Sequence, residues 1–149
     1  MKNIKNLILG LLVLTLSANV SFAGGIGYID YLKVQDNYTF AKEAAKEIDA
    51  KSLELQQYLF DKEKQYKNLD TPLKKKNFEE RTKKEFNAKQ EAFTKLTKEK
   101  EDAVFNKIRE AANQVLVEQQ LDAVVDNRVI FVGGIDITNL VINKLNGKK

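Results

Sequence analysis

Residues 68–72 read Asn68-Leu69-Asp70-Thr71-Pro72, and they hold the only proline of this 149-residue chain. They interrupt a run of residues 28–132 that contains no glycine and is rich in Ala, Leu, Glu, Lys and Gln, most of them strong helix formers. Asp70 or Thr71 can cap a helix that begins at Pro72, because the N–H that proline lacks would be unpaired there in any case. This stretch therefore predicts the turn between two long helices.

The two predicted helices cover residues 38–68 and 73–120 and differ in their apolar patterns. The first has seam positions at alternating steps of four and three, which is typical of a coiled coil. Those seam positions are Ala41, Ala45, Ile48, Ser52, Leu55, Leu59, Lys62, Tyr66 and Leu69, with Ser52 and Lys62 as polar interruptions. In the second helix Phe93, Val104 and Val115 recur every eleven residues, a period that favours straight or slightly right-handed winding.

Helices of these lengths would extend roughly 45 and 70 Å at about 1.5 Å per residue, too far for a compact domain of this size. We therefore predict a mostly α fold with a small β part. In this fold residues 38–120 form a long antiparallel α-hairpin arm, with its tip near residues 69–72, and the arm projects from a β body.

Short apolar segments at both ends of the arm supply the predicted β body, which comprises residues 24–37 and 121–149. Residues 26–29 predict one strand. Residues 122–132 predict a β-hairpin, because they are rich in β-branched residues around a polar turn. We expect Gly133-Gly134 to end this hairpin and a short terminal helix to follow, capped by Asp136 or Thr138.

Three short strands in one chain leave unpaired edges, which proteins normally cover or close. A two-helix hairpin also cannot surround a core by itself. We therefore predict an oligomer in which the small sheets join, although the pattern does not set the number of copies. We expect the following apolar residues to form the core of the base and the oligomer interface: Ile26, Tyr28, Ile29, Val124, Val125, Val129, Ile130 and Phe131.

Residues 1–23 have the pattern of a secretory signal peptide. A lysine-containing start precedes an apolar run over residues 7–16, and small residues precede a cleavage site after Ala23. Ten apolar residues are too few to span a bilayer, which needs about 20. We therefore expect export across the inner membrane and a mature chain of residues 24–149 with a net charge of +2.

The composition removes most catalytic chemistry. The chain has no His and no Cys, which excludes His-dependent triads, the usual zinc ligand sets and disulfides. Asp30, Asp36, Asp122 and Asp126 could form a carboxylate pair for glycoside chemistry, but caps and turns explain them better. We expect no enzyme, no metal and no cofactor.

Three motifs carry a resemblance to a known family, and the last two are specific in this order. They are Ile26-Gly27-Tyr28-Ile29-Asp30, Leu121-Asp122-Ala123-Val124-Val125-Asp126 followed by Val129-Ile130-Phe131, and Asp136-Ile137-Thr138-Asn139-Leu140-Val141. With them, residues 26–146 resemble the Skp (OmpH-like) family of periplasmic chaperones. The resemblance implies a homotrimer with a β-barrel body and three α-hairpin arms around a cavity. It also implies that unfolded outer-membrane proteins are held in this cavity without ATP.

Basic residues gather near the predicted tip. Residues 62–98 contain twelve basic and six acidic residues. The cluster can capture acidic clients or contact an anionic membrane surface or lipopolysaccharide, whereas each lysine alone can be a solvated, ion-paired position. The predicted tip residues are Lys74, Lys75, Lys76, Arg81, Lys83 and Lys84.

Aromatic side chains of the arm either line a client cavity or pack between the helices. Tyr66 lies on the predicted seam, which favours packing, whereas Phe60 lies off the seam, which favours client contact. The predicted client-binding aromatics are Phe60, Phe78 and Phe86.

Two other classes of function fit parts of the sequence. A structural spacer or tether in the cell envelope would also contain long helices. Nucleic-acid binding fits the basic isoelectric point of the whole chain, near 9.1, but the export signal and the charge of +2 on the mature chain argue against it. We therefore expect no nucleic-acid partner.

Overall fold

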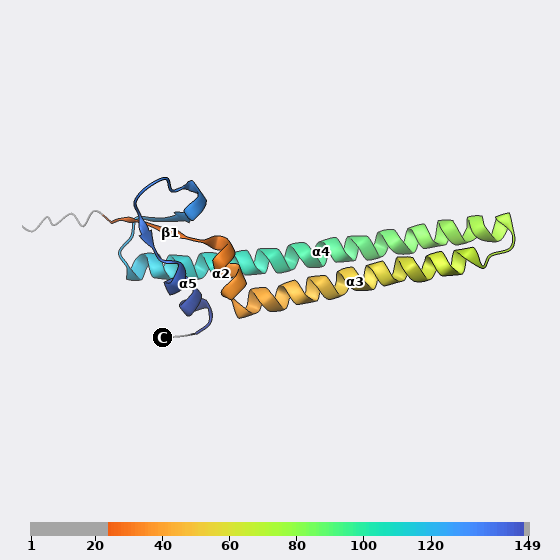
Figure 1. The fold of residues 1–149 in the computed structure, drawn as a ribbon, viewed down its shortest axis with the longest axis horizontal. Helices are drawn as coiled ribbons and strands as arrows, with labels where there is room; N and C mark the ends of the chain where they lie inside the picture. Colours follow the sequence, from red (N-terminus) through yellow and green to blue (C-terminus); the bar gives the residue numbers. More distant parts are fainter. Residues whose placement is uncertain (1–23, 148–149) are drawn as a thin grey trace, which may run out of the picture.

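The computed structural model describes residues 24–147, so the predicted signal peptide lies outside the described residues. Two long antiparallel helices extend from one compact end, which we call the base (Figure 1). The elements are β1 (Ile26–Ile29), α2 (Tyr31–Asn37), α3 (Thr39–Lys67), α4 (Pro72–Glu118), β2 (Ala123–Asp126), a 3-10 turn (Asn127–Val129), β3 (Ile135–Asp136) and α5 (Thr138–Leu145). Among these, no helix has the length and hydrophobicity needed to cross a membrane.

The arm consists of α3 and α4, whose bounds agree with the predicted helices to within two residues at each end. Thr71 caps α4, since its side chain accepts a hydrogen bond of 3.3 Å from the backbone N–H of Lys74. Pro72 occupies the first helical position, as the sequence predicts. Local residue preferences are sufficient to place this turn.

The phase of the predicted seam is wrong at two positions of α3. Ala45 and Leu59 are exposed, and their neighbours Ala44 and Tyr58 turn toward α4 instead. At both places two adjacent residues are apolar or aromatic, so spacing alone cannot select between them. The contacts with α4 make the selection.

The sheet of the base has the order β2-β1-β3, and both pairings are parallel. Ile26 pairs with Ala123, and Gly27 pairs with both Val124 and Ile135. The predicted antiparallel hairpin over residues 122–132 is therefore wrong. Strand β2 forms as expected, but Val129, Ile130 and Phe131 form no second strand.

A local ion pair turns the chain where the hairpin was expected. The Asp126 carboxylate accepts hydrogen bonds from the Arg128 backbone N–H at 2.9 Å and from Arg128 Nε at 2.7 Å. The resulting 3-10 turn directs the chain away from β2. Gly133 and Gly134, with φ of +84° and +88°, then return it to the other edge of β1.

The sequence pattern did not predict helix α2 or strand β3. Asp30 caps α2, since its Oδ1 accepts from the Lys33 N–H at 2.9 Å. The expected cap of α5 is partly correct, because Asp136 Oδ1 accepts from the Thr138 N–H at 2.9 Å although Ile137 occupies the cap position. Thr138 is buried and its hydroxyl accepts from the Asp30 N–H at 3.0 Å, so α5 and α2 are joined.

The elbow between α2 and α3 is held by a residue distant in sequence. Asn146 Oδ1 accepts from the Thr39 N–H at 3.1 Å, and Asn146 Nδ2 donates to the Asn37 carbonyl at 2.8 Å. Tyr38 at the N-cap of α3 makes no side-chain cap, so Asn146 supplies this function from beyond α5. The core lies directly behind the elbow, where Val34, Ile108, Val115, Ile137 and Val141 are almost completely buried.

Candidate functional surfaces

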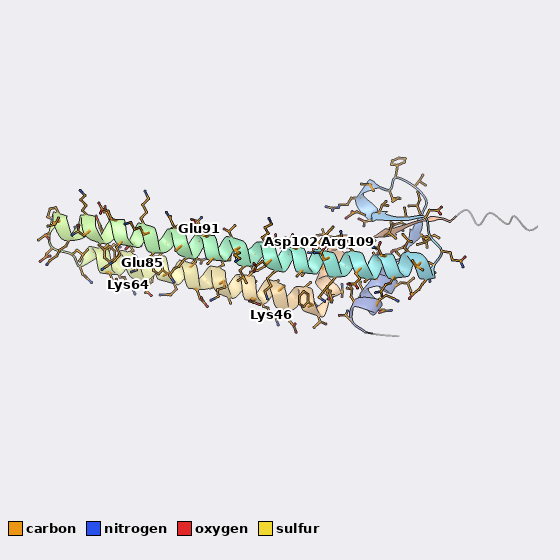
Figure 2. All side chains as sticks on the ribbon, turned by 180° about the vertical axis from the view of Figure 1, so that it is seen from behind. Lys46, Lys64, Glu85, Glu91, Asp102 and Arg109 are labelled. Atoms are coloured by element: carbon orange, nitrogen blue, oxygen red, sulfur yellow. The ribbon has the colours of Figure 1, made fainter. Side chains whose placement is uncertain are left out.

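The charge of the arm changes sign along its length. Residues 62–98 form the distal arm, which carries twelve basic and six acidic side chains. Residues 38–61 and 99–120 form the proximal arm, which together carries six basic and ten acidic side chains. Side chains of both signs cover the outside of the helices (Figure 2). An elongated chain whose arm has opposite net charge on its two halves attracts anions mainly at its tip.

The six predicted tip residues do not behave alike. Lys74 pairs with Asp70 at 2.9 Å, and this hydrogen bond lowers the pKa of the Asp70 carboxyl. Arg81 lies 3.8 Å from Glu85, and Lys75 Nζ lies 5.4 Å from the centre of the Tyr66 ring. Among the described residues, Lys76, Lys83 and Lys84 make no ion pair.

A cross-arm polar contact joins Tyr58, Lys62 and Glu85. Glu85 Oε2 accepts hydrogen bonds from Lys62 Nζ and from Tyr58 OH, both at 2.8 Å. The hydrogen bond from Lys62, followed by that from Tyr58, lowers the pKa of Glu85, and the same contact raises the pKa of Lys62. Lys62, expected as an interruption of the seam, is therefore a partner that fixes the register of α3 on α4. The sequence lacked a sign of this pairing, because 23 residues separate the two charges.

The aromatic residues of the distal arm and of the adjoining turn of α3, residues 58–61, divide between packing and exposure. Phe78 is only 8% exposed and lies with its ring centre 6.3 Å from that of Tyr66. Helix packing therefore accounts for Phe78, and its expected contact with clients would need the arm to open. Phe60 is 51% exposed, with Lys64 Nζ 4.3 Å from its ring centre, and Phe86 is half-buried.

The expected interface residues of the base also divide. Ile29 is buried in the core of its own chain, so it is a core residue and not a surface residue. Tyr28, Val124, Val125 and Ile130 are half-buried. Large apolar side chains are fully or largely exposed along residues 129–135 and on β1, namely Val129, Phe131, Val132, Ile135 and Ile26.

The base also contains a groove of about 600 Å³ between β2 and α4. Tyr31, Phe105, Leu116 and Val124 line it, and Tyr31 and Phe105 approach with ring centres 6.4 Å apart. Phe105 remains 51% exposed. The base therefore presents both an apolar groove and an exposed apolar loop.

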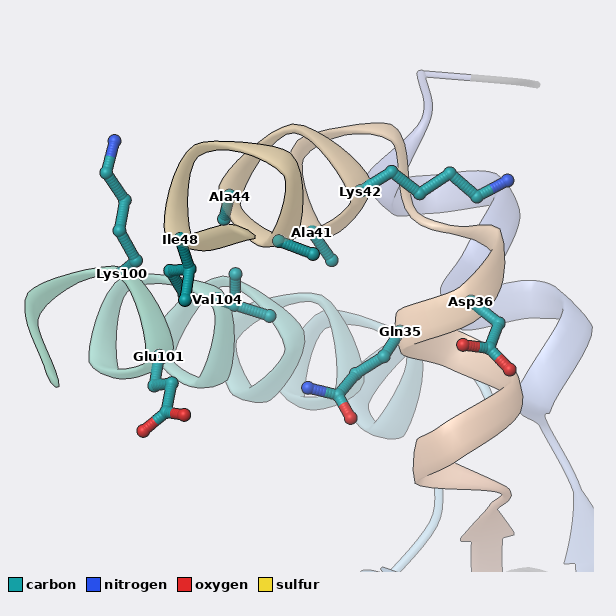
Figure 3. A pocket seen from close by; sticks show the side chains of 10 residues that line it. Gln35, Asp36, Ala41, Lys42, Ala44, Ile48, Lys100, Glu101 and Val104 are labelled. Carbon is teal, nitrogen blue, oxygen red and sulfur yellow. The ribbon is translucent and has the colours of Figure 1, made fainter. Parts of the chain in front are cut away.

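A smaller cleft of about 350 Å³ lies at the elbow (Figure 3). Ala41 and Ala44 of α3 face Val104 of α4 there, with Gln35 and Glu101 at the edge. The small alanine side chains let the two helices approach closely, and the cleft is the space left beside them.

The carboxylates considered for catalysis have structural roles where the structure shows their contacts. Asp30 caps α2 and Asp126 holds the turn through Arg128. Within residues 24–147, no group of three or more Asp or Glu residues is arranged to hold a metal ion.

Comparison with known proteins agrees with the family resemblance. The model of the family "Outer membrane protein (OmpH-like)" matches residues 25–145, which include both the base and the arm. No curated protein matches the chain. The chain is similar to an OmpH-like protein of Caulobacter crescentus CB15 in a crystal structure, at 12% identity and a TM-score of 0.42, over 83% of this chain and 85% of that one. The match over residues 25–145 shows that this chain belongs to the OmpH-like outer membrane protein family.

Proposed function

We propose that this protein is an ATP-independent periplasmic holdase chaperone, which binds unfolded outer-membrane proteins between the arms of a trimer and prevents their aggregation. The observation that carries the proposal is the family match over residues 25–145, because it includes the base and the complete arm. The Caulobacter protein in the crystal structure is described as a candidate outer membrane chaperone, but the proposal does not depend on this distant likeness. In this proposal residues 1–23 direct export and are removed after Ala23.

The proposed activity needs binding alone. A protein that binds the unfolded chain lowers the concentration of free unfolded chain, and aggregation slows by mass action. The distal arm offers cationic groups at Lys76, Lys83 and Lys84, and α3 adds the exposed ring of Phe60. Such a mixed surface can hold acidic and apolar segments, and it can also contact an anionic membrane surface or lipopolysaccharide.

We propose the homotrimer because the base is incomplete in one chain. Strands β2 and β3 are the outer strands of the sheet, and each has one edge that no other strand of the described chain covers. The exposed loop around Phe131 and the groove beside Phe105 are apolar surfaces of the kind that interfaces bury. Joining three copies through residues 24–37 and 121–149 would form the proposed β-barrel body and bring three arms around one cavity.

The decisive experiment measures aggregation of a client. An unfolded outer-membrane β-barrel protein is diluted from denaturant with residues 24–149 of this chain, and light scattering is followed. We expect scattering to be suppressed at equimolar trimer without ATP. Undiminished scattering at a severalfold excess of trimer would end the proposal.

A spacer or tether in the envelope is the second candidate. The 47-residue helix α4 favours it, since this helix alone extends about 70 Å at about 1.5 Å per residue. A tether would hold folded partners and leave unfolded clients to aggregate. The scattering experiment therefore separates the two functions.

A further inference from the structure

An apolar groove lies where the distal arm meets the adjoining turn of α3, residues 58–61, and the family match does not explain it. An open groove of about 430 Å³ runs between α3 and α4, lined by Leu59, Tyr66, Phe78 and Phe86. Its volume is within the range of roughly 300–1,000 Å³ that is usual for ligand sites. This groove, which we call the distal groove, is separate from the assembly surfaces at the base.

The groove is open because the line of residues that packs α3 against α4 lies to one side of it. Tyr58 takes the seam position and hydrogen-bonds Glu85, so Leu59 lies outside the seam and is 44% exposed. Phe86 is half-buried on the facing helix. Phe78 and Tyr66 form a closed floor, with ring centres 6.3 Å apart. An apolar side chain from elsewhere would therefore find apolar contacts on both helices.

The charges at the groove favour a bound segment in which a carboxylate lies next to that apolar side chain. Lys83 lies on the rim and makes no ion pair among the described residues. Lys62 is already bound by Glu85, and Glu63 is bound by Lys67 at 2.5 Å. Glu79 is the remaining acidic group of the lining, and it lies beside Tyr66, whose pKa it raises through a hydrogen bond. The surrounding distal arm has twice as many basic as acidic residues.

We propose that the distal groove binds an extended peptide segment that carries an aromatic or large aliphatic side chain next to a carboxylate. The apolar side chain enters between Leu59 and Phe86, and the carboxylate pairs with Lys83. This inference rests on the proposed chaperone function and deepens it, because it names the local chemistry of the segments that the arm selects.

The first test uses two neighbouring lysines as a matched pair. Lys83 lines the groove and Lys84 does not, yet both lie in the same charged region of α4. Fluorescence anisotropy measures binding of a short labelled peptide with Phe between two Asp residues to residues 24–149. We expect Lys83→Gln to weaken binding about two- to fivefold, as for one exposed ion pair, and Lys84→Gln to weaken it less.

The second test uses two exposed leucines of α3. Leu59 lines the groove, whereas Leu53 is 63% exposed and lies outside it. We expect Leu59→Ser to weaken binding of the Phe peptide about tenfold, in the range for loss of apolar contacts in a pocket, and Leu53→Ser to leave it unchanged. Circular dichroism of each variant checks that the helices persist.

The peptide itself supplies the remaining controls. Replacing its Phe by Ala, or its two Asp by Asn, should each weaken binding to the wild-type chain. Equal losses for Lys83→Gln and Lys84→Gln, or for Leu59→Ser and Leu53→Ser, would overturn the inference, as would absence of peptide binding. If the chain suppresses client scattering but the paired variants lose peptide binding equally, only the inference about the distal groove fails. If the peptide binds at the groove but the chain does not suppress client scattering, only the chaperone proposal fails.

Discussion

Near the base, α3 and α4 meet through Ala41, Ala44 and Val104, which are all buried, whereas toward the tip they meet through Tyr58, Lys62 and Glu85. The proximal contacts are continuous with the core of the base, which reaches Val115 and Val141. The distal contacts form a separate set of hydrogen bonds and aromatic pairs. The proximal arm is thus held by contiguous apolar burial and by one ion pair across the helices, Lys100 with Glu47 at 2.5 Å, whereas the distal arm is held by polar and aromatic contacts that lie outside the contiguous core.

This difference has a physical consequence for the proposed function. Apolar burial responds little to moderate salt, but contacts between partly exposed charges weaken as salt or protonation removes their attraction. The distal arm can therefore open or adjust while the base stays folded. A client-binding arm on a fixed support needs this combination.

The largest expected effect is loss of the proposed assembly through a change in the base. Val125 lies on β2, at the groove, and is part of the proposed trimer interface. We expect Val125→Asp to reduce the solution mass from three chains to one, because an unpaired carboxylate is costly to bury in an apolar interface. Light scattering coupled to size exclusion measures the mass. An unchanged mass would show that β2 does not form the interface.

The next prediction compares one buried residue from each half of the arm. Ile108 is 2% exposed and belongs to the contiguous core, whereas Phe78 is 8% exposed and lies outside it. We expect Ile108→Ala to lower the free energy of unfolding by about 3 kcal/mol, within the usual cost of a buried cavity. Phe78→Ala should lower it less, despite its larger side chain.

Urea denaturation at one fixed protein concentration measures both variants, because the proposed assembly would make the apparent stability depend on concentration. An equal or larger loss for Phe78→Ala would show that the distal arm unfolds with the base as one unit. The proximal and distal arms would then not differ in how strongly they are held to the rest of the fold.

A third prediction concerns the charge of the distal arm. Changing Lys74, Lys75, Lys76, Arg81, Lys83 and Lys84 together to Glu should weaken capture of an unfolded client at least about tenfold at low salt, since several exposed attractions are lost. The salt dependence of capture should become flat, and the solution mass, three chains in the proposed trimer, should stay the same. Unchanged capture at low salt would refute a role for the tip in client binding.

The smallest expected effect is local and depends on pH. The pKa of Glu85 is lowered by its bonds to Lys62 and Tyr58. Glu85 therefore contributes stability at pH values above the ordinary glutamate range, and this contribution is lost as the pH falls below that range. We expect Glu85→Gln to speed hydrogen exchange in the distal arm at neutral pH and to leave the base unchanged.

The pH dependence supplies the control for this variant. The difference in stability between wild type and Glu85→Gln should shrink as the pH is lowered past the glutamate range, where wild-type Glu85 becomes protonated. A difference that stays constant with pH would show that shape, and not charge, accounts for the effect of the variant.

The structure that the sequence predicts is correct where contacts between neighbouring residues determine it. Thr71 and Pro72 start α4 through contacts within one turn, and the strong helix formers of residues 39–67 and 72–118, which contain no glycine, favour two long helices. The family could also be recognised from the sequence, because its most specific motifs, at residues 121–131 and 136–141, are short segments of the chain. The sequence did not predict contacts between residues far apart in the chain, such as the hydrogen bond between Lys62 and Glu85.

The errors in the base have the same origin. The apolar residues 129–132 have strand propensity, but Asp126 and Arg128 turn the chain first, and Ile135 pairs with Gly27 instead. Ala44 and Ala45 are equivalent in the sequence, yet only Ala44 faces α4. Local propensity states what a segment can form, and it does not state which partner the segment meets.

The amino-acid sequence by itself determined the two long helices, their turn at Thr71-Pro72, the basic distal arm and the family, because each depends on composition or on residues close together in the chain. The tertiary structure alone decided the parallel order β2-β1-β3, the phase of the seam and the position of the distal groove. These features depend on which distant side chains come into contact, and burial and hydrogen bonding between such partners select one arrangement among several that local preferences allow.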